Sequence, residues 1–233
     1  MMDSTPPPQL LLRLAAVVST TWSLHVTTSD PNPVPTEEQK REVSVMERHT
    51  RDILGTVMRI SYSLAGGFET IVIIARVVSR RSRDDMLTGT CIDHIKITSA
   101  AVIGSIAVVI AAFIRMWCYR TLGRLFTFQL ALLPQHKLIT SGPYAIVRHP
   151  SYTGVLLALT GTMFVYGTRG SLTYECRMGD YVWTLVWGTF VIMTYSITVS
   201  RCMREDELLH KTFGEEWERW SRRVRWRLVP GIF

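Results

Sequence analysis

The side chains best suited to chemistry form a short run in the second half of the chain. Arg148, His149 and Pro150 stand together, and Tyr152 and Gly154 follow closely. Pro150 suits the first turn of a helix, and a helix N-terminus carries partial positive charge and free N–H groups. Such an end can hold a carboxylate or another anion. The plainer alternative is a juxtamembrane loop in which Arg148 contacts lipid phosphates.

A second charged cluster occupies residues 201–207. Arg201 and Glu205 are four residues apart, so they share a face of the predicted helix, and Asp206 follows Glu205. The planar guanidinium of an arginine can pair with a ligand carboxylate through two hydrogen bonds. The alternative is an ordinary surface salt bridge, worth roughly a few tenths of a kcal/mol.

Apolar runs flank both clusters, and a transmembrane helix needs about 20 mostly apolar residues. These runs predict membrane-spanning helices at residues 10–26, 53–78, 97–119, 154–167 and 181–200. We therefore expect an all-α fold, a multi-span integral membrane bundle of about five transmembrane helices. Residues 1–119 would form an N-terminal region with about three spans. Residues 120–233 would form a catalytic region with two spans, a connecting loop and a C-terminal helix, and this half would build the site.

The tail repeats apolar residues every three or four positions, which predicts an amphipathic helix broken mildly at Gly214. The basic run 219–227 contains two tryptophans. Aromatic residues among arginines can bind single-stranded nucleic acid, but beside several apolar spans we expect contact with anionic membrane lipid instead.

The composition favours a membrane protein over a soluble enzyme. Of the 233 residues, 47% are hydrophobic and 19% are charged, and the net charge is +7. Soluble domains typically have roughly 25% charged residues. A basic excess fits nucleic acid, an anionic membrane or an acidic substrate, and the apolar runs favour the membrane, so no nucleic-acid partner is expected. The four cysteines lie far apart without a C-x-x-C pair, so neither a metal site nor a disulfide-rich fold is expected.

The basic residues outside the spans indicate an orientation. With five spans, the segments on the side of the C-terminal tail hold sixteen Lys and Arg, and those on the other side hold six. The positive-inside rule then predicts a cytosolic tail. The loop at 79–96, which contains the basic run SRRSR, disagrees with this assignment.

Two stretches resemble the isoprenylcysteine carboxyl methyltransferase family. The first reads HKLITSGPY at 136–144 and VRHPSYTG at 147–154. The second combines Arg201 and the acidic pair at 205–206 with FGEEW at 213–217 and LVPGI at 228–232. The resemblance covers roughly residues 120–233, about half of the chain.

The resemblance implies an enzyme of the endoplasmic reticulum membrane with a cytosolic catalytic face. It would use S-adenosyl-L-methionine to methylate the C-terminal carboxylate of a prenylated cysteine, exposed when a C-a-a-X protein loses its last three residues. No metal is implied. Arg201 would bind the substrate carboxylate, and Arg201 and Glu205 would be the catalytic residues. The implied cofactor-binding residues are Gln129, His136, Lys137, Leu138, Ile139, Tyr144, His149, Tyr152 and Glu205.

Two features depart from the family pattern. The usual Glu-Glu pair is Glu205-Asp206 here. About five predicted spans are fewer than the eight of animal members, so the N-terminal substrate surface need not be shared.

Three alternatives stay open. A phospholipid amine N-methyltransferase would need a base, since its substrate is an ammonium, and His149 could serve. A sterol-reductase-like membrane enzyme would use NADPH. A non-enzymatic adaptor would leave the joint match of both clusters unexplained. A carboxylate, by contrast, is already ionised at neutral pH and needs no general base.

Overall fold

The computed structural model describes residues 8–32, 45–82, 90–126, 137–176 and 181–233. Every regular element within these ranges is helical, as predicted. The α-helices are α1 (Pro8–Thr28), α2 (Val45–Ser82), α3 (Ser99–Leu122), α4 (Pro150–Tyr166), α5 (Leu172–Glu175), α6 (Tyr181–Phe213) and α7 (Glu215–Arg223). The short 3₁₀ helices are η2 (Cys91–His94), η3 (Gly123–Leu125) and η4 (Gly142–Ala145).

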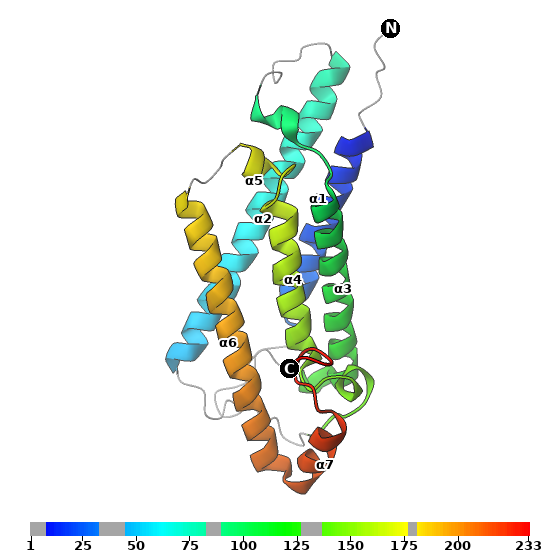
Figure 1. Ribbon diagram of the computed structural model, residues 1–233, viewed down its shortest axis with the longest axis vertical. Helices are drawn as coiled ribbons and strands as arrows, with labels where there is room; N and C mark the ends of the chain where they lie inside the picture. Colours follow the sequence, from blue (N-terminus) through cyan, green and yellow to red (C-terminus); the bar gives the residue numbers. More distant parts are fainter. Residues whose placement is uncertain (1–7, 33–44, 83–89, 127–136, 177–180) are drawn as a thin grey trace.

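The long helices run side by side along one axis (Figure 1). Helix α3 packs against α4 and α1, α1 also packs against α2, and α6 contacts α4 and α7. The short helix α7 lies at one end of the bundle, where the C-terminal tail turns back toward the lower ends of α3 and α4 (Figure 1).

A pair of glycines allows the close crossing of α3 and α4. A Cβ atom built on Gly104 would lie 2.6 Å from the backbone oxygen of Gly161, and a Cβ on Gly161 would lie equally close to the oxygen of Gly104. A Cβ on Gly154, one turn into α4, would meet the Arg115 side chain at 2.8 Å. Small residues at such crossings let helix backbones approach closely in membranes. The neighbour of Gly154 is therefore helix α3.

Three helices in the described part of the chain are long and apolar enough to cross a membrane: Pro8–Thr28, Gly55–Ser79 and Ser99–Leu125. They coincide with the first three predicted spans. The fourth predicted span is α4, whose 17 residues stand at the lower limit for a spanning helix. The fifth forms the first part of α6, which continues for 33 residues in total. The count of five spans therefore remains a prediction.

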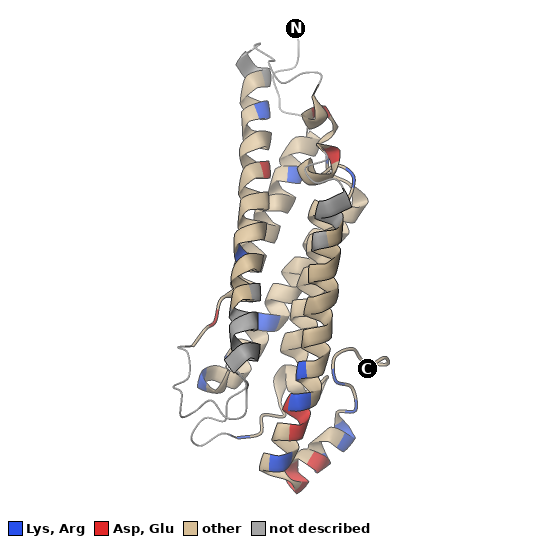
Figure 2. Ribbon diagram, turned by 90° about the vertical axis from the view of Figure 1, so that its left-hand side faces the viewer, with Lys and Arg blue, Asp and Glu red and all other residues tan. Residues whose placement is uncertain are grey.

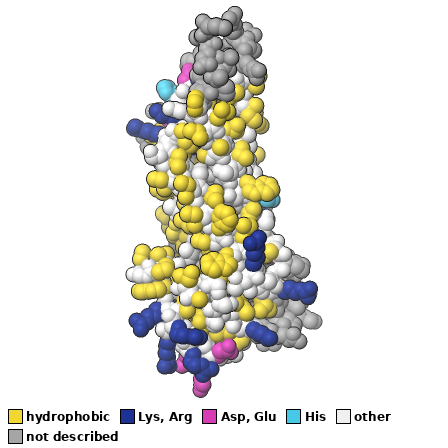
Figure 3. All heavy atoms as spheres, turned by 90° about the vertical axis from the view of Figure 1, so that its right-hand side faces the viewer, with side chains coloured by type: hydrophobic (Ala, Val, Ile, Leu, Met, Phe, Trp, Pro, Cys, Tyr) yellow, Lys and Arg dark blue, Asp and Glu magenta, His cyan; other side chains and the backbone are white. Residues whose placement is uncertain are grey.

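The surface of the bundle changes character along its axis. Apolar side chains cover the middle of the face in Figure 3, and charged side chains gather toward its ends. Figure 2 shows a concentration of both charge signs at the end that holds α7 and the last part of α6. Exposed apolar residues such as Ile103, Ile110 and Phe113 on α3 suit contact with lipid chains.

The predicted amphipathic tail helix is in fact two helices, which corrects the expectation of a mild break. α6 ends at Phe213 and α7 begins at Glu215. Gly214 between them has a φ of +50°, a left-handed conformation that glycine adopts without the usual steric cost. The chain therefore reverses direction there, and α7 brings the tail back to the bundle.

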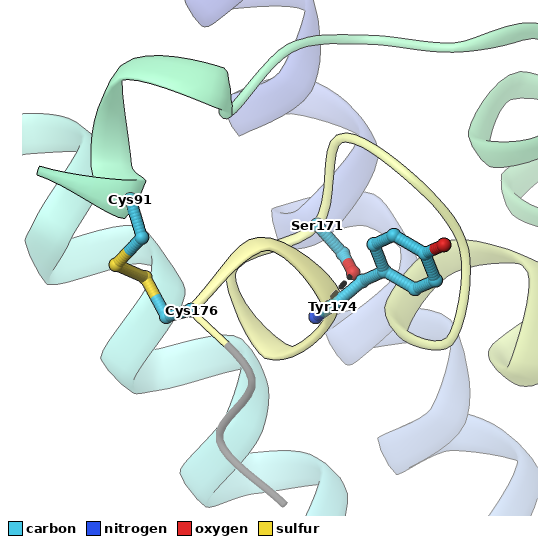
Figure 4. The surroundings of a disulfide bond; sticks show 4 residues. All are labelled: Cys91, Ser171, Tyr174 and Cys176. Carbon is cyan, nitrogen blue, oxygen red and sulfur yellow. Dashed lines mark hydrogen bonds between the residues drawn. A yellow bond between two sulfur atoms is a disulfide. The ribbon is translucent and has the colours of Figure 1, made fainter. Parts of the chain in front are cut away.

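A disulfide joins two loops that the sequence analysis did not connect. Cys91 in η2 is bonded to Cys176, the residue after α5, across 85 positions of sequence (Figure 4). The side chain of Ser171 caps α5 by accepting a hydrogen bond from the Tyr174 amide. Both loops lie at the end of the bundle opposite α7 (Figure 1).

Candidate active site at the charged end of the bundle

The segment before α4 is held by the C-terminal tail. η4 turns the chain toward α4. Pro150 is the first residue of α4, as predicted, and His149 is at the N-cap position of this helix. The Arg148 amide donates to the Trp226 oxygen at 2.9 Å, and the His149 amide donates to the Arg227 oxygen at 2.8 Å. Thr153 adds a hydroxyl hydrogen bond to the oxygen of Leu228 at 2.6 Å. The two stretches that resemble the methyltransferase family are thus in direct contact.

Asp206 of α6 stands at the centre of this contact. Its Oδ2 accepts hydrogen bonds from Arg148 Nη1 at 2.8 Å and from Arg227 Nε at 2.9 Å, and its Oδ1 lies 3.0 Å from His149 Nε2. Burial opposes ionisation of this carboxyl, but the contacts with His149, Arg227 and Arg148 outweigh it, so the pKa of Asp206 lies below its ordinary value. The carboxylate therefore stays charged and links three segments of the chain.

Glu205 belongs to a neighbouring group with Tyr152 and Arg201. The Tyr152 hydroxyl donates to Glu205 Oε2 at 2.8 Å, and the same oxygen lies 3.8 Å from His149 Nδ1. The guanidinium carbon of Arg201 lies 5.8 Å from the centre of the Tyr152 ring. The rings of His149 and Tyr152 are stacked, with centroids 5.7 Å apart. One carboxylate and one guanidinium therefore flank a single tyrosine, and the Glu205 side chain is 31% exposed.

Leu138, Ile139 and Tyr144 have different surroundings from this group. They pack in a hydrophobic cluster with Trp217 and Trp220 of α7. The Trp220 indole donates to the Tyr144 backbone oxygen at 3.1 Å, which ties α7 to η4. Burial, with the nearby Cys118 thiol and Glu205 carboxylate, raises the pKa of Tyr144 well above its usual range. The hydroxyl of Tyr144 therefore stays protonated at neutral pH.

The remaining predicted cofactor residues lie outside these two groups. Lys137 is exposed. Gln129 and His136 lie outside the described residues. A surface hollow of about 580 Å³ borders Thr140, just after the predicted stretch 136–139, and is otherwise lined by Glu216, Arg219, Trp220, Arg222 and Arg223.

Sequence reasoning missed several residues that build the site. Asp206 was noted only as half of an acidic pair, although its carboxylate contacts Arg148, His149 and Arg227. Arg227 appeared only as part of a basic run. Arg115 of α3 was not singled out, yet its Nη1 donates to Ser151 Oγ at 2.6 Å in the first turn of α4. The signal that could have found Arg115 is its charge within the predicted span 97–119, because a charged residue in a membrane span is costly unless it has a partner.

The residues at this end fit a small organic cation. A partly exposed carboxylate beside an aromatic ring is a suitable contact for an ammonium or sulfonium group. The described residues contain no group of three His, Cys, Asp or Glu side chains that could hold a metal ion.

The fold and this site define a class: a multi-pass helical membrane protein with a polar site at one end of an apolar bundle. Residues 102–176 match the family model "Isoprenylcysteine carboxyl methyltransferase (ICMT) family". The chain is therefore similar to this family over its α3–α5 region, which includes the first of the two motif stretches; the second stretch, 201–232, lies outside the matched residues.

Curated relatives include enzymes of two kinds. A probable protein-S-isoprenylcysteine O-methyltransferase of Oryza sativa subsp. indica is 30% identical over 124 residues, covering 52% of this chain and 57% of the relative. A Delta(14)-sterol reductase of Neurospora crassa is 31% identical over 115 residues, covering 42% and 24%. A 7-dehydrocholesterol reductase of Danio rerio is 33% identical over 97 residues, covering 42% and 17%. The chain thus spans less than two thirds of each relative. No solved structure matches it.

Proposed function

We propose that this protein is an S-adenosyl-L-methionine-dependent methyltransferase. Its substrate would be the C-terminal carboxylate of a prenylated cysteine in processed C-a-a-X proteins, and its product a methyl ester. The observation that carries the proposal is the group around Tyr152, where Glu205 and Arg201 flank one aromatic ring. The match of residues 102–176 to the methyltransferase family model supports it.

The two charged residues suit the two reactants. Bound S-adenosyl-L-methionine supplies an electrophilic methyl group on a positively charged sulfur. Glu205 offers a partly exposed carboxylate to the positive charge of the cofactor. Arg201, one turn earlier on α6, offers a guanidinium to the substrate carboxylate. An ionised carboxylate needs no general base, so the task of these residues is to desolvate and align the reactants, which can be worth about 7–11 kcal/mol.

The apolar bundle suits a substrate with a lipid tail. The exposed side chains of α3 and its neighbours are largely apolar, whereas the site lies at the charged end. A prenyl chain can therefore stay among the helices and membrane lipid while its carboxylate reaches Arg201.

We further propose that the protein lies in the endoplasmic reticulum membrane with the site in the cytosol. Two observations support this orientation. Most Lys and Arg outside the predicted spans fall on the side of the tail. The disulfide lies at the opposite end, and disulfides persist in oxidising compartments such as the lumen of this organelle. Cys91 lies in the loop 79–96, which disagreed with the charge rule, and its bond to Cys176 favours a lumenal position for this loop.

The relatives also support a second candidate, a sterol-reductase-like enzyme that uses NADPH. The identities to two sterol reductases, 31% and 33%, are as high as the identity to the rice methyltransferase. The methyltransferase match covers more of this chain and a larger share of the relative. We therefore favour the methyltransferase and include the reductase in the test.

The test uses membranes that contain the full chain and S-adenosyl-L-methionine labelled on its methyl group. N-acetyl-farnesylcysteine is one acceptor and phosphatidylethanolamine is the rival acceptor. We expect label that base releases as methanol, and its loss with Arg201→Ala or Glu205→Gln. The matched controls are Arg204→Ala and Glu207→Gln, because both residues are exposed on the same helix. Label in phospholipid, or binding of NADPH in place of S-adenosyl-L-methionine, would contradict the proposal.

A further inference from the structure

The adjacent acids of α6 lie in different surroundings. The Asp206 side chain is 6% exposed, and both of its oxygens are engaged by Arg148, His149 and Arg227. The Glu205 side chain is 31% exposed and accepts a hydrogen bond from Tyr152. Successive residues of a helix point about 100° apart, so the two acids face different parts of the site.

The contacts of Asp206 determine how His149 is oriented. Because a carboxylate only accepts hydrogen bonds, the nitrogen next to Asp206 Oδ1, Nε2, must carry its proton. The other ring nitrogen, Nδ1, is then directed toward Glu205 Oε2 at 3.8 Å. The ring also stacks on Tyr152. A shift of the His149 ring would therefore disturb both neighbours of the proposed cofactor site.

We infer that Asp206 is a positioning residue that acts through His149, whereas Glu205 alone of the acidic pair contacts the ligand. This inference rests on the proposed function. It assigns different tasks to two residues that the family resemblance treats as one acidic pair. Asp206 orients the imidazole, and its ion pairs with Arg148 and Arg227 hold the carboxylate in place.

The C-terminal tail also contacts Asp206 and His149. Arg227 pairs with Asp206 through its side chain, while its backbone oxygen accepts from the His149 amide. The tail thus contacts both partners of the Asp206–His149 interaction. The Arg227 guanidinium also lies over the ring of Phe233, with 5.2 Å between the guanidinium carbon and the ring centre.

A double-mutant cycle tests whether Asp206 acts through His149. The dissociation constant of S-adenosyl-L-methionine is measured by calorimetry on the purified full chain, for wild type, Asp206→Asn, His149→Ala and the double variant. We expect Asp206→Asn to weaken binding about 10- to 100-fold, as the loss of a hydrogen bond to a charged group does. In the His149→Ala background, the same change should have almost no further effect.

Two further variants separate positioning from other roles. Asp206→Glu keeps the charge and should recover most of the affinity. Glu207→Gln is the control, because Glu207 is an exposed acid next to Asp206. The thermal unfolding temperature of each variant is measured in parallel, so that a loss of folded protein is not counted as a loss of affinity.

The outcomes separate this inference from the proposed function. Equal effects of Asp206→Asn with and without His149 would mean that Asp206 contacts the ligand itself, and would overturn the inference while the methyltransferase proposal stands. If the wild-type chain binds NADPH and not S-adenosyl-L-methionine, the proposed function fails, and the same cycle measured with NADPH still decides the role of Asp206. A wild-type chain that binds neither compound overturns both.

Discussion

Arg13 of α1 donates from Nε to Glu69 Oε1 of α2 at 2.7 Å, and both side chains are almost completely buried. The Arg13 Nη2 also donates to the backbone oxygen of Val165 in α4 at 2.7 Å. One ion pair therefore links three helices inside the apolar bundle. Charged groups at such depth are costly unless they are paired, so this contact restricts how the first two helices pack.

Removal of one partner of this pair should destabilise the bundle strongly. Glu69→Gln leaves the Arg13 guanidinium buried without its counter-charge, and we expect a loss of about 3–5 kcal/mol. The thermal unfolding of the purified protein in detergent measures this loss. Arg59→Gln, an exposed change in the same helix, is the control. The double variant Arg13→Met with Glu69→Leu should lose less than either single change; a double variant that loses the sum of both would argue against the pair.

Removal of the disulfide should loosen the end of the bundle opposite the site. Cys91→Ser or Cys176→Ser opens a link across 85 residues, and such links typically contribute about 2–4 kcal/mol. We expect a lower unfolding temperature that matches the effect of a reductant on the wild type. A maleimide reagent should label Cys91 and Cys176 only after reduction. The buried Cys118 and Cys202 are the internal comparison, and labelling of Cys91 without reductant would contradict the bond.

The close crossing of α3 and α4 should not tolerate a side chain. In Gly161→Val, the new Cβ would lie 2.6 Å from the Gly104 oxygen and 2.7 Å from a methyl carbon of Val108. We expect a loss of stability of at least about 1–3 kcal/mol, because the two helices must move apart. Gly67→Val in α2 is the matched control, since no described atom lies within 4 Å of a Cβ there. Unfolding temperature and size-exclusion profile report the difference.

The ionisation of Asp206 should make the stability of the folded chain depend on pH in the acidic range. The pKa of Asp206 is lower in the folded chain than the ordinary 3.8. The stability that its charge contributes is therefore fully present above pH 3.8 and is lost as the pH falls through the folded-state pKa. Wild type should therefore exceed Asp206→Asn in unfolding temperature at about pH 6, and the difference should shrink below about pH 4. Glu207→Gln should show no such trend. A difference that stays constant down to the lowest pH would exclude this role of the charge.

The local pattern of the sequence predicted the helical elements well. Long apolar runs correspond to α1, α2 and α3, and Pro150 marks the start of α4. These features depend on residues close together in the chain, where hydrophobic length and proline geometry act directly. The tail was predicted less well, because the positive φ of Gly214 is a property of the folded backbone.

The candidate site was predicted in part. His149, Tyr152, Glu205 and Arg201 were named from motifs, and they lie together in the structure. Motifs did not reveal that Leu138, Ile139 and Tyr144 pack in a hydrophobic cluster with Trp217 and Trp220, nor that Arg227 reaches Asp206.

By itself the sequence determined an apolar helical chain whose second half carries two charged motifs that resemble those of a membrane methyltransferase family. Only the tertiary structure decided which charges meet. Arg13 and Glu69 are 56 positions apart, Arg148 and Asp206 are 58 apart, and Cys91 and Cys176 are 85 apart. The physical reason is that helix periodicity assigns a residue to a face, whereas the partner of that face depends on how distant helices cross. Here the glycines allow the close crossing of α3 and α4, and the backbone bond from His149 to Arg227 joins the tail to the start of α4.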